Sequence, residues 1–162
     1  MNAPDPFALL RREHRDLGML FQRHQEALLR RRWAHAARLL SHHHARLAAH
    51  IRIEEDWLLP CAPGAQSAAP RWNPEIYRAE HRKLLELAGK LAIKLARARR
   101  RGVSPTLLLA LLDEEKTFKH VFEHHHRREE RGLFGELPRQ LSAETRSGLC
   151  AALLPQEHVR RH

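Results

Sequence analysis

The sequence contains little of what β-sheets, disulfide frameworks or membrane spans require. Only 2 of its 162 residues are cysteine, 6% are aromatic, and β-branched residues are scarce. Because no C-x-x-C motif occurs, we expect Cys61 and Cys150 to be reduced thiols. No apolar run is long enough to cross a bilayer, and the first residues lack the apolar segment of an export signal. These absences predict a cytoplasmic protein without a membrane partner.

Familiar catalytic fingerprints are missing as well. The chain has no nucleophile elbow, P-loop or dinucleotide-binding glycine motif, so conventional hydrolase, kinase or NAD-dependent chemistry is not indicated. The net charge of +10 allows a basic nucleic-acid-binding protein as a lesser alternative. The fourteen histidines need a different explanation, because histidine suits metal binding and proton transfer.

The residues that are abundant, Leu, Ala, Arg, Glu and His, favour helix. Asp5-Pro6, Asn73-Pro74 and Ser104-Pro105 each place a capping side chain before a proline, which is typical of a helix start. Gly102 follows a basic segment and predicts a helix end. Residues 60–74 are rich in proline and predict a loop, and residues 142–154 predict a short extra helix.

One helix boundary has no local signal, and an internal repeat supplies it. The tripeptide Glu-His-Arg occurs at residues 13–15 and again at 80–82, and an H-x-x-x-E-E segment follows each copy. The number of residues from His81 to Gly102, counted forward from His14, and the number from Pro105 to His125, counted back from His50, place a turn at residues 30–35. The second helix then covers Trp33 to Leu59.

Short connections make successive helices antiparallel neighbours. We therefore predict a single all-α domain over residues 1–162. Residues 6–135 form an antiparallel up-down-up-down four-helix bundle, and residues 136–162 form a C-terminal extension with a short helix.

Histidines and carboxylates recur at matching depths of this predicted bundle. A histidine and a glutamate four residues apart lie on one helix face. In an antiparallel bundle the starts of helices one and three and the ends of helices two and four lie together, and burying their polar groups without a metal would be costly. The predicted metal ligands are His14, His50, Glu54, His81, His125 and Glu129.

The ligand types narrow the choice of metal. Four imidazoles and two carboxylates that can bridge are too many for one tetrahedral zinc site, and they suit a pair of iron ions. Zinc or manganese could substitute. Ferritin-type di-iron proteins use Glu-x-x-His with glutamates on the other helices. The order here is His-x-x-x-Glu with histidines on the other helices, which argues against that class.

Over residues 6–135 the pattern resembles the hemerythrin-like (HHE cation-binding) family. The matching elements, in chain order, are Glu13-His14, His50 with Glu54 and Glu55, Glu80-His81, and His125 with Glu129 and Glu130. The resemblance implies an oxo- or hydroxo-bridged di-iron centre that binds or senses O₂, NO or peroxide, with weak peroxidase-like or NO-related redox activity as an option. The alternative it implies is iron binding for storage or homeostasis without ligand chemistry.

The chain departs from the oxygen-carrying members of that family on helix three. Those proteins place two histidines one turn apart there, whereas His81 has Tyr77 one turn before it. Tyr77 could bind iron, donate a hydrogen bond to a ligand, or pack at the end of the bundle. The carriers also use the spacing that would select Glu130. We prefer Glu129, because it is in helical phase with His125.

Other polar residues have more ordinary interpretations. His43 lies one heptad before His50 and could line the core beneath the metal or join a hydrogen-bond shell. His24 is expected to be a plain residue of an amphipathic face, and the neighbours of His125, His124 and His126, are expected on the surface. Two basic clusters should complement helix dipoles or dock an acidic partner; they are Arg30, Arg31 and Arg32, and Arg99, Arg100 and Arg101.

Overall fold

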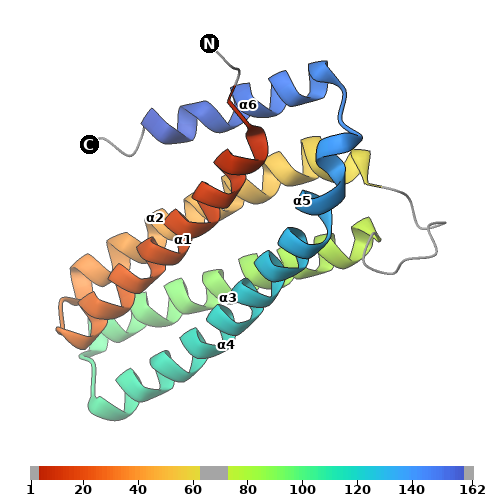
Figure 1. The fold of residues 1–162 in the computed structure, drawn as a ribbon. Coiled ribbons are helices and arrows are strands. Elements are labelled where there is room, and N and C mark those ends of the chain that lie inside the picture. Colours follow the sequence, from red (N-terminus) through yellow and green to blue (C-terminus); the bar gives the residue numbers. More distant parts are fainter. Residues whose placement is uncertain (1–3, 63–72, 159–162) are drawn as a thin grey trace.

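The computed structural model describes residues 4–62 and 73–158, and within these ranges the chain is helical without strands (Figure 1). The predicted all-α class is therefore confirmed, while most of the predicted loop at residues 60–74 lies outside the described residues. No described helix is long and apolar enough to cross a membrane. The elements are α1 (Pro6–Leu29), α2 (Trp33–Ile53), the π-helix η1 (Glu54–Leu58), the 3₁₀-helix η2 (Leu59–Cys61), α3 (Pro74–Arg101), α4 (Pro105–Arg131), α5 (Leu133–Glu136), the 3₁₀-helix η4 (Leu137–Arg139) and α6 (Ala143–His158).

The three capping predictions are confirmed. The side chain of Asp5 accepts a hydrogen bond from the backbone N–H of Phe7 at 3.1 Å, and a proline follows each cap. Asn73 and Ser104 cap α3 and α4 in the same way, at 2.9 Å and 3.2 Å. Each cap satisfies a backbone donor that the helix leaves without a partner.

The turn that only the repeat predicted is also confirmed. α1 ends at Leu29, and Arg31 has a positive φ of 55°, a conformation that reverses the chain. The backbone N–H of Arg32 returns to the carbonyl of Ala27 at 2.8 Å. Because no glycine or proline occurs here, the sequence carries no local signal for the turn.

The end of the second helix differs from the prediction of a continuous α-helix to Leu59. Glu54–Leu58 forms a π-helix, which inserts one extra residue into the turn. Leu58, the last residue of this segment, and Leu59, which follows it, are both buried. This local widening begins at Glu54, one of the predicted ligands.

The long helices pack in chain order. α1 contacts α2, α2 contacts α3, α3 contacts α4, and α4 also contacts α1 (Figure 1). One apolar cluster fills the space between them, with Leu17, Leu47, Leu84 and Phe118 among its members. A second apolar cluster lies beyond the predicted ligands at the end formed by the start of α1 and by α5 and α6; it includes Phe7, Leu10, Leu58, Tyr77, Phe134 and Leu149. The predicted ligands thus form a polar layer between two apolar clusters.

The predicted extra helix is present as α6 and is longer than expected. It packs on α1, α2 and η1 (Figure 1). Leu149 and Leu153 are buried. Gly148 lies against the ring of Trp57 in η1, where a methyl group would come within 2.3 Å of two ring atoms. α6 therefore covers the π-helical segment that begins at Glu54.

Candidate metal centre

The structure brings the predicted ligands together in the polar layer. None of them is more than 7% exposed: His14, His50, Glu54, His81, His125 and Glu129. Together with His126, which was not predicted as a ligand, they offer nitrogen and oxygen atoms in two groups, within each of which all ligand atoms lie within 4.8 Å of one another. One group contains Glu54, His81, His125 and Glu129; the other contains His14, His50, His126 and Glu129. Both groups are positioned to hold a metal ion.

The two buried glutamates connect these groups. Oε1 of Glu54 lies 2.9 Å from Nε2 of His50, while its Oε2 lies 3.4 Å from Nε2 of His81. Glu129 behaves in the same way, with Oε2 3.3 Å from Nε2 of His14 and Oε1 3.3 Å from Nε2 of His125. Each carboxylate therefore presents one oxygen to each side of the centre.

These close contacts have the geometry of ligands around a cation. Two ligands at right angles, each about 2.1 Å from a metal, lie about 3 Å apart. Nε2 of His14 and Nε2 of His50 are 2.9 Å apart. Among the described residues, neither oxygen of Glu54 or Glu129 has a hydrogen-bond partner, and neither does Nε2 of His81. Buried polar atoms without partners are costly, and a bound cation would satisfy them all.

Further carboxylates orient the histidines of α3 and α4. Nδ1 of His81 lies 2.9 Å from Oε1 of Glu55, and Nδ1 of His125 lies 3.0 Å from Oε2 of Glu80. Arg128 donates to the other oxygen of Glu80 at 2.9 Å. A carboxylate on Nδ1 directs Nε2 to the centre and makes the imidazole a stronger ligand. Glu55 and Glu80 thus orient metal-binding histidines, a role that the sequence interpretation did not assign to them.

The buried charges of the centre depend on one another. Burial by itself lowers the pKa of His125, but the Glu129 and Glu80 carboxylates outweigh it and raise that pKa to about 10. Burial likewise opposes the charge of Glu54, yet His50, His14 and His81 hold its pKa well below the ordinary value. The buried carboxylates raise the pKa of His50 as well as that of His125, so a metal that binds there must displace the protons that these two imidazoles hold.

His126 is a residue that the sequence interpretation placed wrongly on the surface. Its ring stacks on that of His14, with centroids 3.7 Å apart and planes 7° apart, and its edge meets Phe122 at 4.0 Å. α4 contacts α1 as well as α3, so its interior face is wide enough to include the residue that follows His125. His126 therefore belongs to the centre, whereas His124 stays exposed.

Tyr77 and Glu130 occupy different environments. Tyr77 is fully buried in the apolar cluster that closes the end of the site, and its ring centroid lies 6.5 Å from that of His125. Glu130 is exposed and forms an ion pair with Arg11 at 2.9 Å. The geometry thus places Glu129, and not Glu130, in the polar layer.

Two further histidines are buried on the other side of the centre. His43 lines the core beneath it, with the rings of Phe21 and Phe118 at 5.2 Å and 5.5 Å. Neither nitrogen of His43 has a hydrogen-bond partner among the residues described, so it does not form the hydrogen-bond shell considered above. His24 was expected to be an ordinary amphipathic-face residue, but it is fully buried and forms a 2.8 Å ion pair with Glu115.

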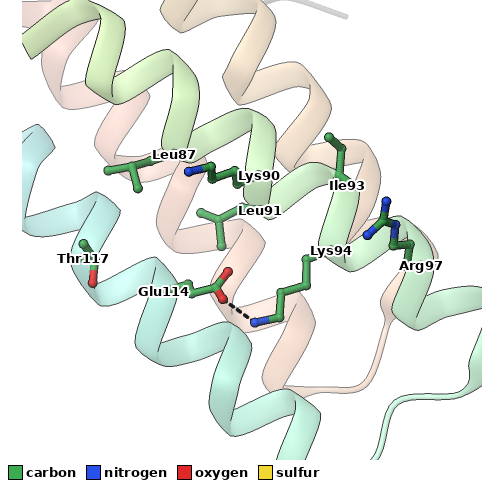
Figure 2. Close-up of a pocket in the computed structure, with 8 residues that line it drawn as sticks. All are labelled: Leu87, Lys90, Leu91, Ile93, Lys94, Arg97, Glu114 and Thr117. Carbon is green, nitrogen blue, oxygen red and sulfur yellow. Dashed lines mark hydrogen bonds and ion pairs between the residues drawn. The ribbon is translucent and has the colours of Figure 1, made fainter. Parts of the chain in front are cut away.

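A surface groove lies between α3 and α4 (Figure 2), and no histidine is among the residues that line it. Its lining combines apolar and charged side chains: Leu87, Lys90, Leu91, Ile93, Lys94, Arg97, Glu114 and Thr117. Lys94 pairs with Glu114 across the groove. The arginines at 99–101 form the last turn of α3, where positive charge stabilises the helix dipole. The same role predicted for Arg30, Arg31 and Arg32 is wrong for the last turn of α1, because α1 ends at Leu29 and has no basic residue in that turn.

Sequence comparison adds no assignment to this geometry. No protein-family model matches the chain, and neither the curated proteins nor the solved structures contain a match to it.

Proposed function

We propose that this protein is a non-haem di-iron protein of the hemerythrin-like type, built on an antiparallel four-helix bundle, which binds or senses O₂, NO or peroxide. One observation carries the proposal. Glu54 and Glu129 each direct one oxygen to the histidines of α1 and α2 and the other to the histidines of α3 and α4.

Two metals account for this arrangement better than one does. A single cation would draw the donors to one point, whereas the donors here form two groups that share Glu129. A carboxylate whose two oxygens face different imidazoles has the geometry of a bridge between two ions. Both glutamates are buried and lack hydrogen-bond partners in the described part of the chain, so a bridging role would satisfy each oxygen.

Iron suits the donor set. Imidazole combined with carboxylate is typical of iron sites, and closed structural zinc sites are tetrahedral and use four ligands. Zinc and manganese would compete for the same atoms, so the metal content of the isolated protein depends on supply as well as on geometry. A di-iron pair supplies reversible one-electron change and a coordination position for a small ligand.

The surrounding residues hold this centre and exclude water. Phe134 stacks on His14 at 5.4 Å between ring centroids and packs against Phe7 at 5.7 Å. Glu55 and Glu80 hold His81 and His125 through their Nδ1 atoms, so that Nε2 stays directed at the centre. Apolar clusters flank the polar layer on both sides, so the centre offers few groups besides its own donors that could recognise a larger polar metabolite.

The test combines metal analysis with spectroscopy. Reconstituted, oxidised protein should contain about two irons per chain and show near-ultraviolet charge-transfer absorption that anaerobic reduction removes. Exposure of the reduced protein to O₂, NO or peroxide should change the spectrum. Iron uptake with an unchanged spectrum would favour the alternative of storage without ligand chemistry, and failure to take up iron would exclude both.

A further inference from the structure

The surroundings of the two donor groups differ, although the internal repeat would suggest equivalent halves. We propose that the two metal positions are inequivalent: the position between α3 and α4 binds its ion first and more tightly. The position next to α1 and α2 is filled second and takes His126 as a third imidazole ligand. This inference rests on the proposed two-metal centre.

The α3/α4 position has additional negative charge around it. Beyond the shared carboxylates of Glu54 and Glu129, its histidines contact Glu55 and Glu80 at 2.9 Å and 3.0 Å. Arg128 offsets part of the charge of Glu80, while no described cation binds Glu55. Since a dication in a buried site is stabilised by nearby negative charge, this arrangement favours early and tight binding.

The α1/α2 position lacks this support. Nδ1 of His14 and Nδ1 of His50 are buried without a hydrogen-bond partner in the described ranges. The glutamate that precedes His14, which corresponds to Glu80 in the repeat, turns away to Arg46. Arg46 holds both oxygens of Glu13, at 2.7 Å and 2.8 Å. The histidines on this side therefore lack the carboxylate partner that makes an imidazole a stronger ligand.

His126 supplies what this weaker position lacks. Nε2 of His126 is buried without a hydrogen-bond partner in the part of the chain that is described. The residue belongs to the same donor group as His14 and His50. The parallel stack on His14 and the edge contact with Phe122 hold its ring in place. A third imidazole adds a bond without adding charge, so this position is rich in nitrogen and the other is rich in carboxylate.

Calorimetric titration of the metal-free protein with Co²⁺, followed also by visible absorption, tests the inference without any activity measurement. We expect two separable binding steps. The double variant Glu55→Gln/Glu80→Gln should weaken the first step by about 10–100-fold, the range known for partners of metal-bound histidines. The matched control is Glu86→Gln, an exposed glutamate of α3 that pairs with Lys90.

His126→Phe keeps an aromatic ring against His14 and removes the ligand nitrogen. It should weaken the second step by at least about 10-fold and leave the first step unchanged, which also shows that the variant is folded. His120→Phe, an exposed position on α4, is the control. If the larger ring disturbs folding in circular dichroism, His126→Asn replaces it.

The outcomes separate this inference from the proposed function. Failure of the wild-type protein to bind Co²⁺ or Fe²⁺ would refute the two-metal centre itself. Two equivalents that bind in one indistinguishable step, or a His126→Phe titration identical to that of wild type, would overturn the inequivalence alone. Loss of both steps in a natively folded His126 variant would overturn it as well.

Discussion

Two buried histidine regions of this protein, the metal centre and the His24–Glu115 pair, differ in how their polar atoms are satisfied. Nδ1 of His24 lies 2.8 Å from the carbonyl oxygen of Ala36, and its Nε2 lies 2.8 Å from Glu115. Gln25 donates to the other oxygen of Glu115 at 3.1 Å. The centre has the opposite character, because most of its buried donor atoms lack aligned hydrogen bonds within the described chain. Burial of a histidine is therefore a poor sign of a metal site, and unmet donor atoms are a better one.

The largest effect is expected from the removal of Glu129, which both donor groups share. Glu129→Ala should lower metal affinity at both positions by about 1000-fold or more, since loss of a ligand exceeds the 10–100-fold effect of losing an outer partner. Glu130→Ala is the matched control, because that exposed residue pairs with Arg11 at the surface. Equal metal contents of the two variants would contradict the assignment of Glu129.

Replacing the glutamate of the His24–Glu115 pair by alanine should lower the stability of the fold and leave metal binding unchanged. Glu115→Ala leaves His24 buried beside a cavity without its partner, and breaking a buried ion pair typically costs about 3–5 kcal/mol. We expect a lower urea midpoint and two metal equivalents in the protein that remains folded. Reduced metal stoichiometry at unchanged stability would mean that this pair belongs to the centre after all.

His43 offers an intermediate case, buried like His24 and without partners like the centre. Burial lowers its pKa from 6.5 to about 3, so between these values the unfolded chain binds a proton that the folded chain does not. The contribution of neutral His43 to the free energy of unfolding is fully present above pH 6.5 and is lost as the pH falls toward 3. Relative to His43→Leu, metal-free wild type should lose about 1.4 kcal/mol between pH 7.5 and 5.5. Parallel urea stability curves for the two proteins would refute a neutral His43.

The smallest expected effect concerns the cover of the centre. Gly148→Ala in α6 pushes a methyl group against Trp57 of the π-helix that contains Glu54. Overpacking costs about 1–3 kcal/mol, and up to about 1 kcal/mol is regained from helix propensity. A net loss near 1 kcal/mol in thermal unfolding is expected. Gly89→Ala, which meets nothing within 4 Å, should instead stabilise α3, so equal shifts of the two variants would contradict contact with Trp57.

Much of this site is predictable because it depends on local periodicity. Helix caps at Asp5, Asn73 and Ser104 act within one turn, and a histidine with a glutamate four residues later shares a face in any α-helix. The repeat even located a turn that has no glycine or proline. Glu55 and Glu80 could have been assigned too, since they directly adjoin ligands in the repeated motifs.

The position of His126 could not be predicted from local periodicity. Consecutive helical residues point about 100° apart, so periodicity selects either His125 or His126 for a narrow interior face. α4 contacts α1 in addition to α3, and this wider face includes both residues. The π-helix after Ile53 has no local signal in the sequence either; α6 packs on it, and Gly148 of α6 lies against its Trp57.

The sequence by itself determined the helical elements, their boundaries at the caps and the hidden turn, and the depth at which histidines and glutamates occur. Only the tertiary structure decided which oxygen of Glu54 and Glu129 faces which helices, that His126 lies inside, and that Glu13 binds Arg46 while its repeat counterpart binds His125. Local patterns determine where a side chain lies on its own helix. Its neighbours across the core depend on how separate helices pack, and this packing makes the two halves of a repeated sequence different.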